Sequence, residues 1–545
     1  MFFAKTICLS ILLSCFLTAA PKANGELKLQ DFSKYEPSFE KDFFIYYYLR
    51  QKQISPSQAD EAFYQTNKVN SKIFGAWAKH SPSPDIKQIL KCQRIAQVKS
   101  VDNVDCLTLA LNANMLFGYH EDKVFLKRLL DLFVPYANKH EDYAEISTLL
   151  QALLQDNFAQ KVLKNEPLFL DLFGKISYQN IKKHFNQPMS EKKINSLATS
   201  SYPFSAFVQK IATNPELEYL QKSLLVLVDS NKLTLKSYWF LGLNALKYKK
   251  NKLAEYYLLS YYKKTNNIED KNKALFWLYR ITNDKLYFDS LAKSYYLDLY
   301  SLYAQMQMQI FPDVVSVINE DKTMHKPPFI EGNPMEYLRY QDKIDINNQE
   351  LKYIGTLPYL VREYEKYFAY KKNFFYIPKY IQKVQATREQ KAMLLAIARQ
   401  ESRFIPTAIS SSFAAGVMQI LPFVSEEIAI RSGYDYDAFA MFDPKTSVKF
   451  ADFHLKILSK HLIHPLFIAY GYSNGMGFTK SVLRREYFGS GEYEPYLSME
   501  LMPNNQARKY GKNVLANYII YLNLLGTSET LNQSVVQIDK KKVKY

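Results

Sequence analysis

Residues 391–404 read KAMLLAIARQESRF, the clearest helical stretch in this chain of 545 residues. Ala, Leu and Ile occupy most of its positions, which predicts a buried helix, and Pro406 stops that helix soon afterwards. Glu401 then lies in the last turn, beside apolar neighbours and at the negative end of the helix dipole. Both effects disfavour ionisation, so the pKa of Glu401 is predicted to be raised, as a general acid working near neutral pH requires.

The segments that follow Glu401 give this residue a context. Taken alone, a glutamate near a helix end is more often a solvated surface group than a catalyst. Residues 410–422 read SSSFAAGVMQILP, residues 471–477 read GYSNGMG, residues 500–503 read ELMP, and residues 508–515 read RKYGKNVL. In their order and spacing, Glu401 and these segments resemble the motifs of the soluble lytic transglycosylase family. Those motifs are an E-S pair with a serine nine residues later, G-[LV]-M-Q-[IL]-x-P, A-Y-N-A-G-x-G, E-x-I-P and R-x-Y-V-x-N-V-L.

The resemblance is strong over residues 374–525 and weak in the helical region before them, at residues 274–280 and 300–304. It implies an all-α protein, with an N-terminal superhelix that in the family closes into a ring, a short helical linker domain and a C-terminal lysozyme-like domain. By position it implies that Glu401 is the catalytic acid, that Ser410 and Gln419 line the saccharide site, and that Tyr472 supports both the reacting sugar and the acid. Glu500 is either a second carboxylate near the cleft or a structural hydrogen-bond anchor.

The family mechanism defines the expected reaction. Glu401 protonates the β-1,4 glycosidic oxygen between N-acetylmuramic acid and N-acetylglucosamine of peptidoglycan, while the muramoyl N-acetyl group stabilises the developing charge. Glu401 then takes the proton of the C6 hydroxyl, which attacks C1 and forms a 1,6-anhydromuramic acid end. Such a reaction needs no cofactor and no metal. Two alternatives stay open: hydrolysis by a goose-type lysozyme-like enzyme, and a non-catalytic helical scaffold that binds the wall.

The chain departs from the family pattern at two positions near the predicted site. Ser473 stands where the family often has Asn, and Phe413 where it often has Gly, so the loop after Ser410 is expected to have its own shape. Gly416 has a physical reason to be glycine, because a residue without Cβ permits a tight turn or a close approach. An ordinary loop glycine is the other interpretation.

Three histidines are candidate metal ligands. His461 and His464 are three residues apart, and His454 lies about two turns earlier on a similar helical face. No HExxH or similar motif accompanies them, which favours surface or packing histidines over a zinc site.

The apolar pattern along the chain predicts its domains. From residue 27 to about residue 309, apolar residues recur at helical spacing in segments such as 143–154 and 253–262, with no strict repeat period. Prolines and polar residues interrupt the pattern between residues 311 and 342. We therefore expect a helical domain at 25–310, a linker domain at 311–373, the catalytic domain at 374–526 and a loose tail at 527–545.

The N-terminus predicts export to the periplasm. Residues 1–24 have a lysine, an apolar run and small residues suited to cleavage, as in a signal peptide, although Cys15 offers an alternative site for a lipid anchor. No later stretch is long and apolar enough to span a membrane. The mature chain keeps two cysteines, Cys92 and Cys106, which could form a disulfide or remain two buried thiols.

The net charge of +17 suits anionic partners. Peptidoglycan glycan strands with their carboxylates fit this charge, whereas export makes nucleic acid a poor choice. Other wall-synthesis or wall-remodelling proteins are further partner candidates. Dispersed lysines also fit a broad compositional bias without any specific basic face.

Overall fold

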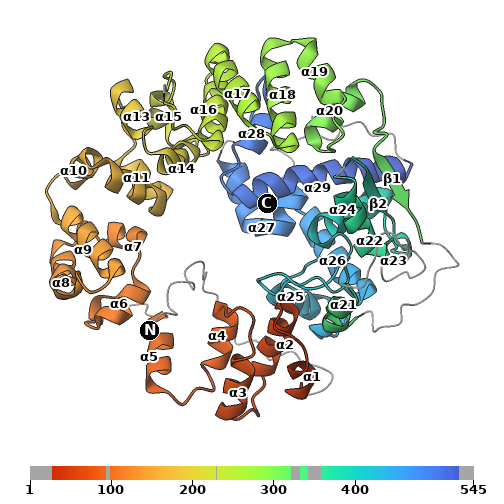
Figure 1. Cartoon of the computed structure of the whole chain (residues 1–545), viewed down its shortest axis with the longest axis horizontal. Helices are drawn as coiled ribbons and strands as arrows, with labels where there is room; N and C mark the ends of the chain where they lie inside the picture. The colour runs from red at the N-terminus through yellow and green to blue at the C-terminus, as the bar shows by residue number, and fades with distance from the viewer. Residues whose placement is uncertain are drawn as a thin grey trace. The chain divides into compact units, whose positions relative to one another are not determined.

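The structure is a computed structural model, and it describes residues 27–93, 98–228, 230–320, 332–341, 357–369, 371–485 and 487–526 (Figure 1). The predicted signal peptide, the alternative lipid-anchor site at Cys15 and the predicted tail lie outside these residues. Among the helices of the described ranges, none is long and apolar enough to cross a membrane.

The chain forms two compact units, and each of them is discontinuous in sequence. The first unit combines Met1–Lys87, Tyr295–Thr479 and Lys509–Tyr545, and the second combines Gln88–Ser294 and Lys480–Arg508. These units group residues by contact. The expected domain boundaries along the sequence therefore stay a prediction.

The second unit is an array of helices that pack on their neighbours in the chain. In Figure 1, α16, α17, α18 and α19 lie side by side in chain order. The predicted helical spacing at 253–262 is confirmed, since α17 buries Ala254, Tyr257, Leu258 and Tyr261, which share one face. The elements of this array are α5 (Pro84–Gln93), η1 (Val98–Ser100), α6 (Val104–Ala110), α7 (Ala113–Gly118), α8 (Lys123–Phe133), η2 (Val134–Tyr136), α9 (Glu141–Leu154), α10 (Phe158–Lys164), α11 (Glu166–Lys175), α12 (Tyr178–His184), α13 (Glu191–Leu197), α14 (Ser201–Ala212), α15 (Glu218–Ser223), α16 (Leu235–Lys247), α17 (Asn251–Lys264), α18 (Ile268–Thr282), α19 (Lys285–Ala292) and α28 (Tyr496–Glu500).

Lysines of this unit satisfy carbonyl groups at helix ends. The Lys210 ammonium donates to the carbonyl oxygens of Phe173, Gly174 and Ile176, at 2.8, 2.9 and 2.6 Å, where α11 ends. The Lys193 ammonium donates in the same way to the carbonyl oxygen of Leu163 near the end of α10. A cation at the negative end of a helix is stabilising, so part of the chain's positive charge has a structural use.

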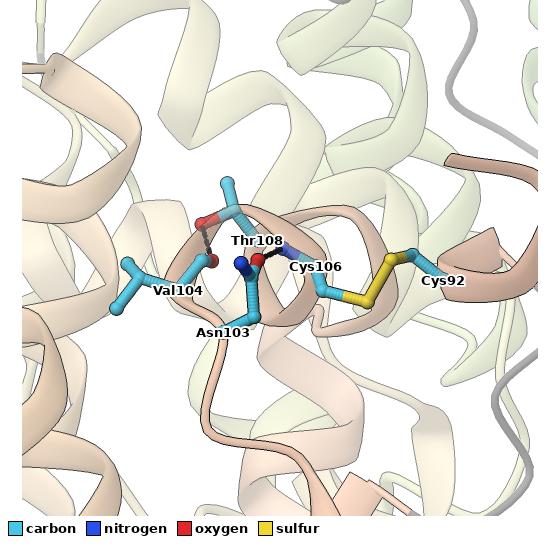
Figure 2. Close-up of a disulfide and its surroundings, with 5 residues drawn as sticks. All are labelled: Cys92, Asn103, Val104, Cys106 and Thr108. Carbon is cyan, nitrogen blue, oxygen red and sulfur yellow. Dashed lines mark hydrogen bonds between the residues drawn. A yellow bond between two sulfur atoms is a disulfide. The ribbon is translucent and has the colours of Figure 1, made fainter. Parts of the chain in front are cut away.

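A disulfide joins the end of α5 to the first turn of α6 (Figure 2). Cys92 and Cys106 form this bond, with their Cα atoms 5.0 Å apart, which decides between the two alternatives left open by the sequence. The side chain of Asn103 caps α6 by accepting from the Cys106 amide at 2.8 Å. Within the next turn, the Thr108 hydroxyl donates to the Val104 carbonyl.

The first unit holds most of the predicted catalytic segment, without Lys480–Arg508, together with the earliest helices of the chain. Its helices are α1 (Gln30–Ser33), α2 (Phe39–Leu49), α3 (Pro56–Phe63), α4 (Ser71–Trp77), α20 (Leu299–Gln307), α21 (Pro334–Gln341), α22 (Leu357–Tyr367), α23 (Lys379–Gln382), α24 (Arg388–Ser402), α25 (Pro422–Ser432), η5 (Phe439–Phe442), α26 (Pro444–Ser459), α27 (Pro465–Arg484) and α29 (Asn505–Leu524), the last two extending into the second unit.

A short parallel sheet was not expected from the sequence. Strand β1 (Val315–Ile318) pairs with β2 (Asn373–Tyr376) in the register Val315 to Asn373. The described residues are otherwise mostly helical, as predicted. The sheet joins the predicted linker region to the start of the predicted catalytic segment.

Candidate active site

Helix α24 carries the predicted catalytic residue and is built as the sequence suggests. Thr387 begins it with a capping box, in which its hydroxyl accepts from the Gln390 amide while the Gln390 side chain accepts from the Thr387 amide. Residues 392–399 are buried. The helix ends at Ser402, before the Phe404 limit of the apolar stretch, because Arg403 and Phe404 adopt left-handed φ angles of 56° and 65°.

Glu401 lies in the last turn of α24 and is half-buried. The Tyr510 hydroxyl donates a hydrogen bond of 2.7 Å to Oε1 of Glu401. Burial raises the pKa of Glu401 to about 7, and the hydrogen bond from Tyr510 acts in the opposite direction. The predicted direction of the shift is confirmed, with burial as its main cause.

Two tyrosines, the half-buried Tyr472 and the buried Tyr510, interact with this carboxyl. Burial and the charge of Glu401 both raise the pKa of Tyr472 and of Tyr510 well above the ordinary tyrosine value. The Tyr472 hydroxyl donates to the carbonyl oxygen of Met418 at 2.7 Å. Both phenols therefore stay protonated at neutral pH and keep one hydrogen to donate.

Sequence reasoning missed Tyr510 as a site residue, although it lies in the quoted segment 508–515. The signal that could have found it is the next residue, Gly511, where the family pattern has Val. A Cβ at Gly511 would lie 2.2 Å from Cε1 of Tyr470, so glycine lets α29 approach α27 closely.

The loop after α24 is held to the end of that helix. The Ser402 hydroxyl donates to the carbonyl oxygen of Val417 at 2.7 Å. Gly416 has a φ of +79°, and a Cβ there would lie 2.0 Å from the carbonyl oxygen of Met441. Glycine is thus required at this position by both backbone conformation and close approach. The Gln419 side-chain amide closes the loop by donating to the carbonyl oxygens of Ala408, at 2.8 Å, and Gly416, at 2.9 Å.

Ser410 and Phe413 shape the same loop. The Ser410 hydroxyl oxygen accepts from the amides of Ala414, at 3.0 Å, and Ser412, at 3.3 Å. Phe413 has a φ of 62°, in the region that favours glycine, and its side chain is fully buried. Its ring packs against Phe43 and Tyr46 of α2. Phe413 therefore adopts a left-handed backbone at a position where the family often has Gly, and it adds an aromatic anchor.

The N-terminal helices of the first unit also hold this loop through polar contacts. The Lys72 ammonium of α4 donates to the carbonyl oxygen of Ser412 at 2.6 Å and lies 5.8 Å from the centre of the Phe413 ring. The Asn70 side chain donates to the carbonyl oxygen of Ser411 at 3.4 Å.

Ser473 and its neighbours lie where α27 is kinked. Gly475 interrupts the helical backbone with φ 84° and ψ 158°. Ser473 and Asn474 are both half-buried. The Asn474 Oδ1 atom is buried and has no hydrogen-bond partner among the residues that the structure describes. An amide group therefore stands beside the altered position Ser473.

Glu500 belongs to the second unit, where it is almost fully buried. Burial lowers the pKa of Lys273, but the charges of Glu500 and Asp270 outweigh it and raise this pKa overall. Lys273 also forms an ion pair of 2.7 Å with Asp270. The same ammonium lies 5.0 Å from the centre of the Trp239 ring. Glu500 thus has a cation of the helical array as an electrostatic partner.

Two of the three candidate histidines, His454 and His464, contact neighbouring residues. The His464 ring accepts from the Leu466 amide at 3.1 Å and so caps the start of α27. The His454 ring lies 5.6 Å from that of Tyr472, and burial lowers the pKa of His454. Within the described ranges, no group of three or more His, Cys, Asp or Glu side chains could hold a metal ion.

Comparisons with known proteins bear on these residues. Residues 379–494 match the family described as "Transglycosylase SLT domain". Among solved structures, the 70-kDa soluble lytic transglycosylase from Escherichia coli is similar, with 15% identity, a TM-score of 0.46, and coverage of 93% of this chain and 85% of that one. An inactive mutant of the lytic transglycosylase Slt from Pseudomonas aeruginosa has 13% identity, a TM-score of 0.43, and coverage of 91% and 84%. A search among curated proteins finds no match.

The family match includes Glu401, Ser410, Gln419 and Tyr472, and Glu500 lies beyond it. It agrees with the predicted resemblance to the lytic transglycosylases and with the prediction of a peptidoglycan lytic transglycosylase. The described helices agree with the predicted all-α class.

Proposed function

We propose that this protein cleaves the β-1,4 bond between N-acetylmuramic acid and N-acetylglucosamine and leaves 1,6-anhydromuramic acid ends. The observation that carries the proposal is the Glu401 carboxyl, which has a pKa raised to about 7 and lies at the end of α24 within a tyrosine-lined site. At that pKa, the carboxyl populates both protonation states at neutral pH. It can therefore give a proton in one step and take one back in the next.

The residues around Glu401 support the two steps. Glu401 donates its proton to the glycosidic oxygen, and the substrate's N-acetyl group stabilises the positive charge at C1. The Glu401 carboxylate, stabilised by the hydrogen bond from Tyr510, then takes the proton of the C6 hydroxyl as this oxygen attacks C1. The groups that act electrostatically on Glu401 in the first unit are tyrosines, and substrate assistance takes the place of a second carboxylate.

The remaining predicted site residues have distinct parts in this proposal. Tyr472 supports the reacting sugar, and Ser410 and Gln419 hold the loop along which the saccharide binds. Glu500 acts from the second unit as an anchor of the segment Lys480–Arg508. In this proposal, the loop held by Ser410 and Gln419 determines the affinity for the substrate and does not affect the protonation of Glu401.

We also propose that the protein works in the periplasm. The disulfide between Cys92 and Cys106 supports this location, because disulfides persist in oxidising compartments. The predicted signal peptide is the second support.

Product analysis of the Glu401→Gln variant beside wild type tests the proposal. Purified peptidoglycan is digested, and the muropeptides are weighed by mass spectrometry. We expect anhydro-muropeptides from wild type and at least about a hundredfold lower rate from the variant, since general acid catalysis alone contributes roughly 10² to 10⁴. Reducing-end muropeptides from wild type would instead show hydrolysis by water. Undiminished activity of the variant would remove Glu401 from its role.

A further inference from the structure

Helix α22, in the predicted linker region, places one buried carboxylate against the end of the catalytic helix. Glu365 on α22 is 1% exposed. Its Oε1 atom accepts from the Arg399 guanidinium at 2.5 Å and from the Phe374 amide at 3.1 Å. Its Oε2 atom lies 2.7 Å from Nη1 of Arg403. One side chain therefore joins α22, β2 and α24.

The two arginines flank Glu401 at equal spacing along the chain. Arg399 lies two residues before it and Arg403 two residues after it. Arg399 is itself buried, donates to the Phe374 carbonyl at 2.6 Å, and has its guanidinium 4.1 Å from the centre of the Phe375 ring. The last turn of α24 is thus fixed on both sides of the catalytic carboxyl.

The backbone at this turn needs such support. Arg403 and Phe404 are consecutive residues with left-handed φ angles, which cost free energy for side chains other than glycine. The Phe404 ring is held by edge contact with Tyr376, 5.4 Å between ring centres. Arg403 is held by an ion pair with Glu365, and a buried carboxylate with two hydrogen bonds and this ion pair has little freedom to move.

We propose that Glu365 is a positioning residue, which fixes the end of α24 through Arg399 and Arg403 and thereby sets the direction of the Glu401 carboxyl. This inference rests on the proposed function of Glu401. It makes the linker region part of the catalytic machinery, although no residue of α22 needs to touch the substrate.

The charged groups around Glu365 come from each element packed on it. Arg399 and Arg403 lie on α24, and the Tyr521 hydroxyl of α29 feels the charge of Glu365 and of both arginines. On α22 itself, Glu363 pairs with Arg362 and Lys366 on the more accessible side of the helix. Glu363 therefore offers a matched control on the same helix.

Steady-state kinetics on uncrosslinked glycan strands of defined length test the positioning role. Glu365→Gln keeps the size of the side chain and an acceptor for the Phe374 amide, and it removes the charge that holds the arginines. Because a misplacement of about 1 Å at a catalytic group costs roughly a hundredfold in rate, we expect kcat to fall tenfold to a hundredfold while KM changes less than about threefold. Glu363→Gln should leave both constants within twofold of wild type.

A double-mutant cycle separates positioning from loss of stability. Arg403→Ala removes a partly exposed partner and leaves the pair of Glu365 and Arg399 intact, so this variant should fold even if Glu365→Gln does not. We expect Arg403→Ala to lower kcat at least fivefold, and Arg403→Lys, which keeps the charge, to restore kcat to within about threefold of wild type. Adding Arg403→Ala to Glu365→Gln should lower kcat by less than about threefold more.

The outcomes distinguish this inference from the proposed function. All rates are measured well below the unfolding temperature of each variant. A kcat within twofold of wild type for Glu365→Gln or Arg403→Ala, or independent effects that multiply in the double variant, would overturn the positioning role while Glu401→Gln stays inactive. An active Glu401→Gln variant would instead overturn the proposed function itself.

Discussion

Replacing Glu401 with glutamine isolates the free energy that burial of this carboxyl costs the fold. The pKa of Glu401 rises from 4.5 to about 7, a difference of about 2.5 units. At about 1.4 kcal/mol per pKa unit, the ceiling is about 3.5 kcal/mol. Because Glu401 is half-buried and solvent screens part of its charge, we expect an effect of about 1 to 2 kcal/mol.

The sign of this effect follows from proton linkage. The folded protein binds the Glu401 proton more tightly than the unfolded chain, so wild type loses stability as the pH rises from about 4.5 to about 7. Glutamine does not titrate, and its Oε1 atom can still accept from Tyr510. Glu401→Gln should therefore match wild type at pH 4 and exceed its free energy of unfolding by about 1 to 2 kcal/mol at pH 8.

Urea unfolding followed by circular dichroism at pH 4, 6 and 8 measures this difference. Glu363→Gln is the control, because ion pairs with Arg362 and Lys366 lower the pKa of Glu363. That variant should lose up to about 0.5 kcal/mol at neutral pH, the opposite sign. A Glu401→Gln variant that is less stable than wild type at pH 8, or whose difference is the same at all three pH values, would refute the reasoning.

Three further changes probe the site. Tyr510→Phe removes the hydrogen bond that lowers the pKa of Glu401, so the corresponding limb of the plot of kcat/KM against pH should move up by about one unit; an unmoved limb would contradict the contact. Phe413→Ala empties a fully buried aromatic site and should cost about 3 to 5 kcal/mol in urea unfolding, and a loss under 1 kcal/mol would speak against that packing. In Gly416→Ala the new Cβ would clash with the Met441 carbonyl oxygen, and the φ of +79° is strained for alanine. We expect the free energy of unfolding to fall by more than about 2 kcal/mol in the same assay. A variant as stable as wild type would show that the loop can shift.

The sequence predicts well those features that depend on neighbours in the chain. The apolar run before Arg399 fixes a buried helix, and the residues after Glu401 stop it, because helix formation and termination are local. The raised pKa of Glu401 could be predicted for the same reason. Glu401 is partly buried because the apolar helix that carries it is buried, and this burial raises its pKa.

Features that depend on distant partners could not be predicted in this way. Tyr510 lies 109 residues from Glu401, and Glu365 lies 34 residues from Arg399, so no periodic pattern connects either pair. Cys92 and Cys106 left two alternatives open because only the distance between their Cα atoms decides whether a disulfide can form. Pairing information of this kind is present only once the chain is folded.

The support of the catalytic carboxyl extends beyond the segment that the motifs define. Phe43 of α2 lies against Phe413, Phe439 and Phe442, so helices from the start of the chain complete the core around the loop after Ser410. Glu365 of α22, which precedes the predicted start of the catalytic domain at residue 374, holds the end of α24. The motifs mark the residues near the chemistry, because those residues carry family-specific side chains. The side chains that hold them in place are ordinary core and ion-pair residues, and contact alone identifies their role.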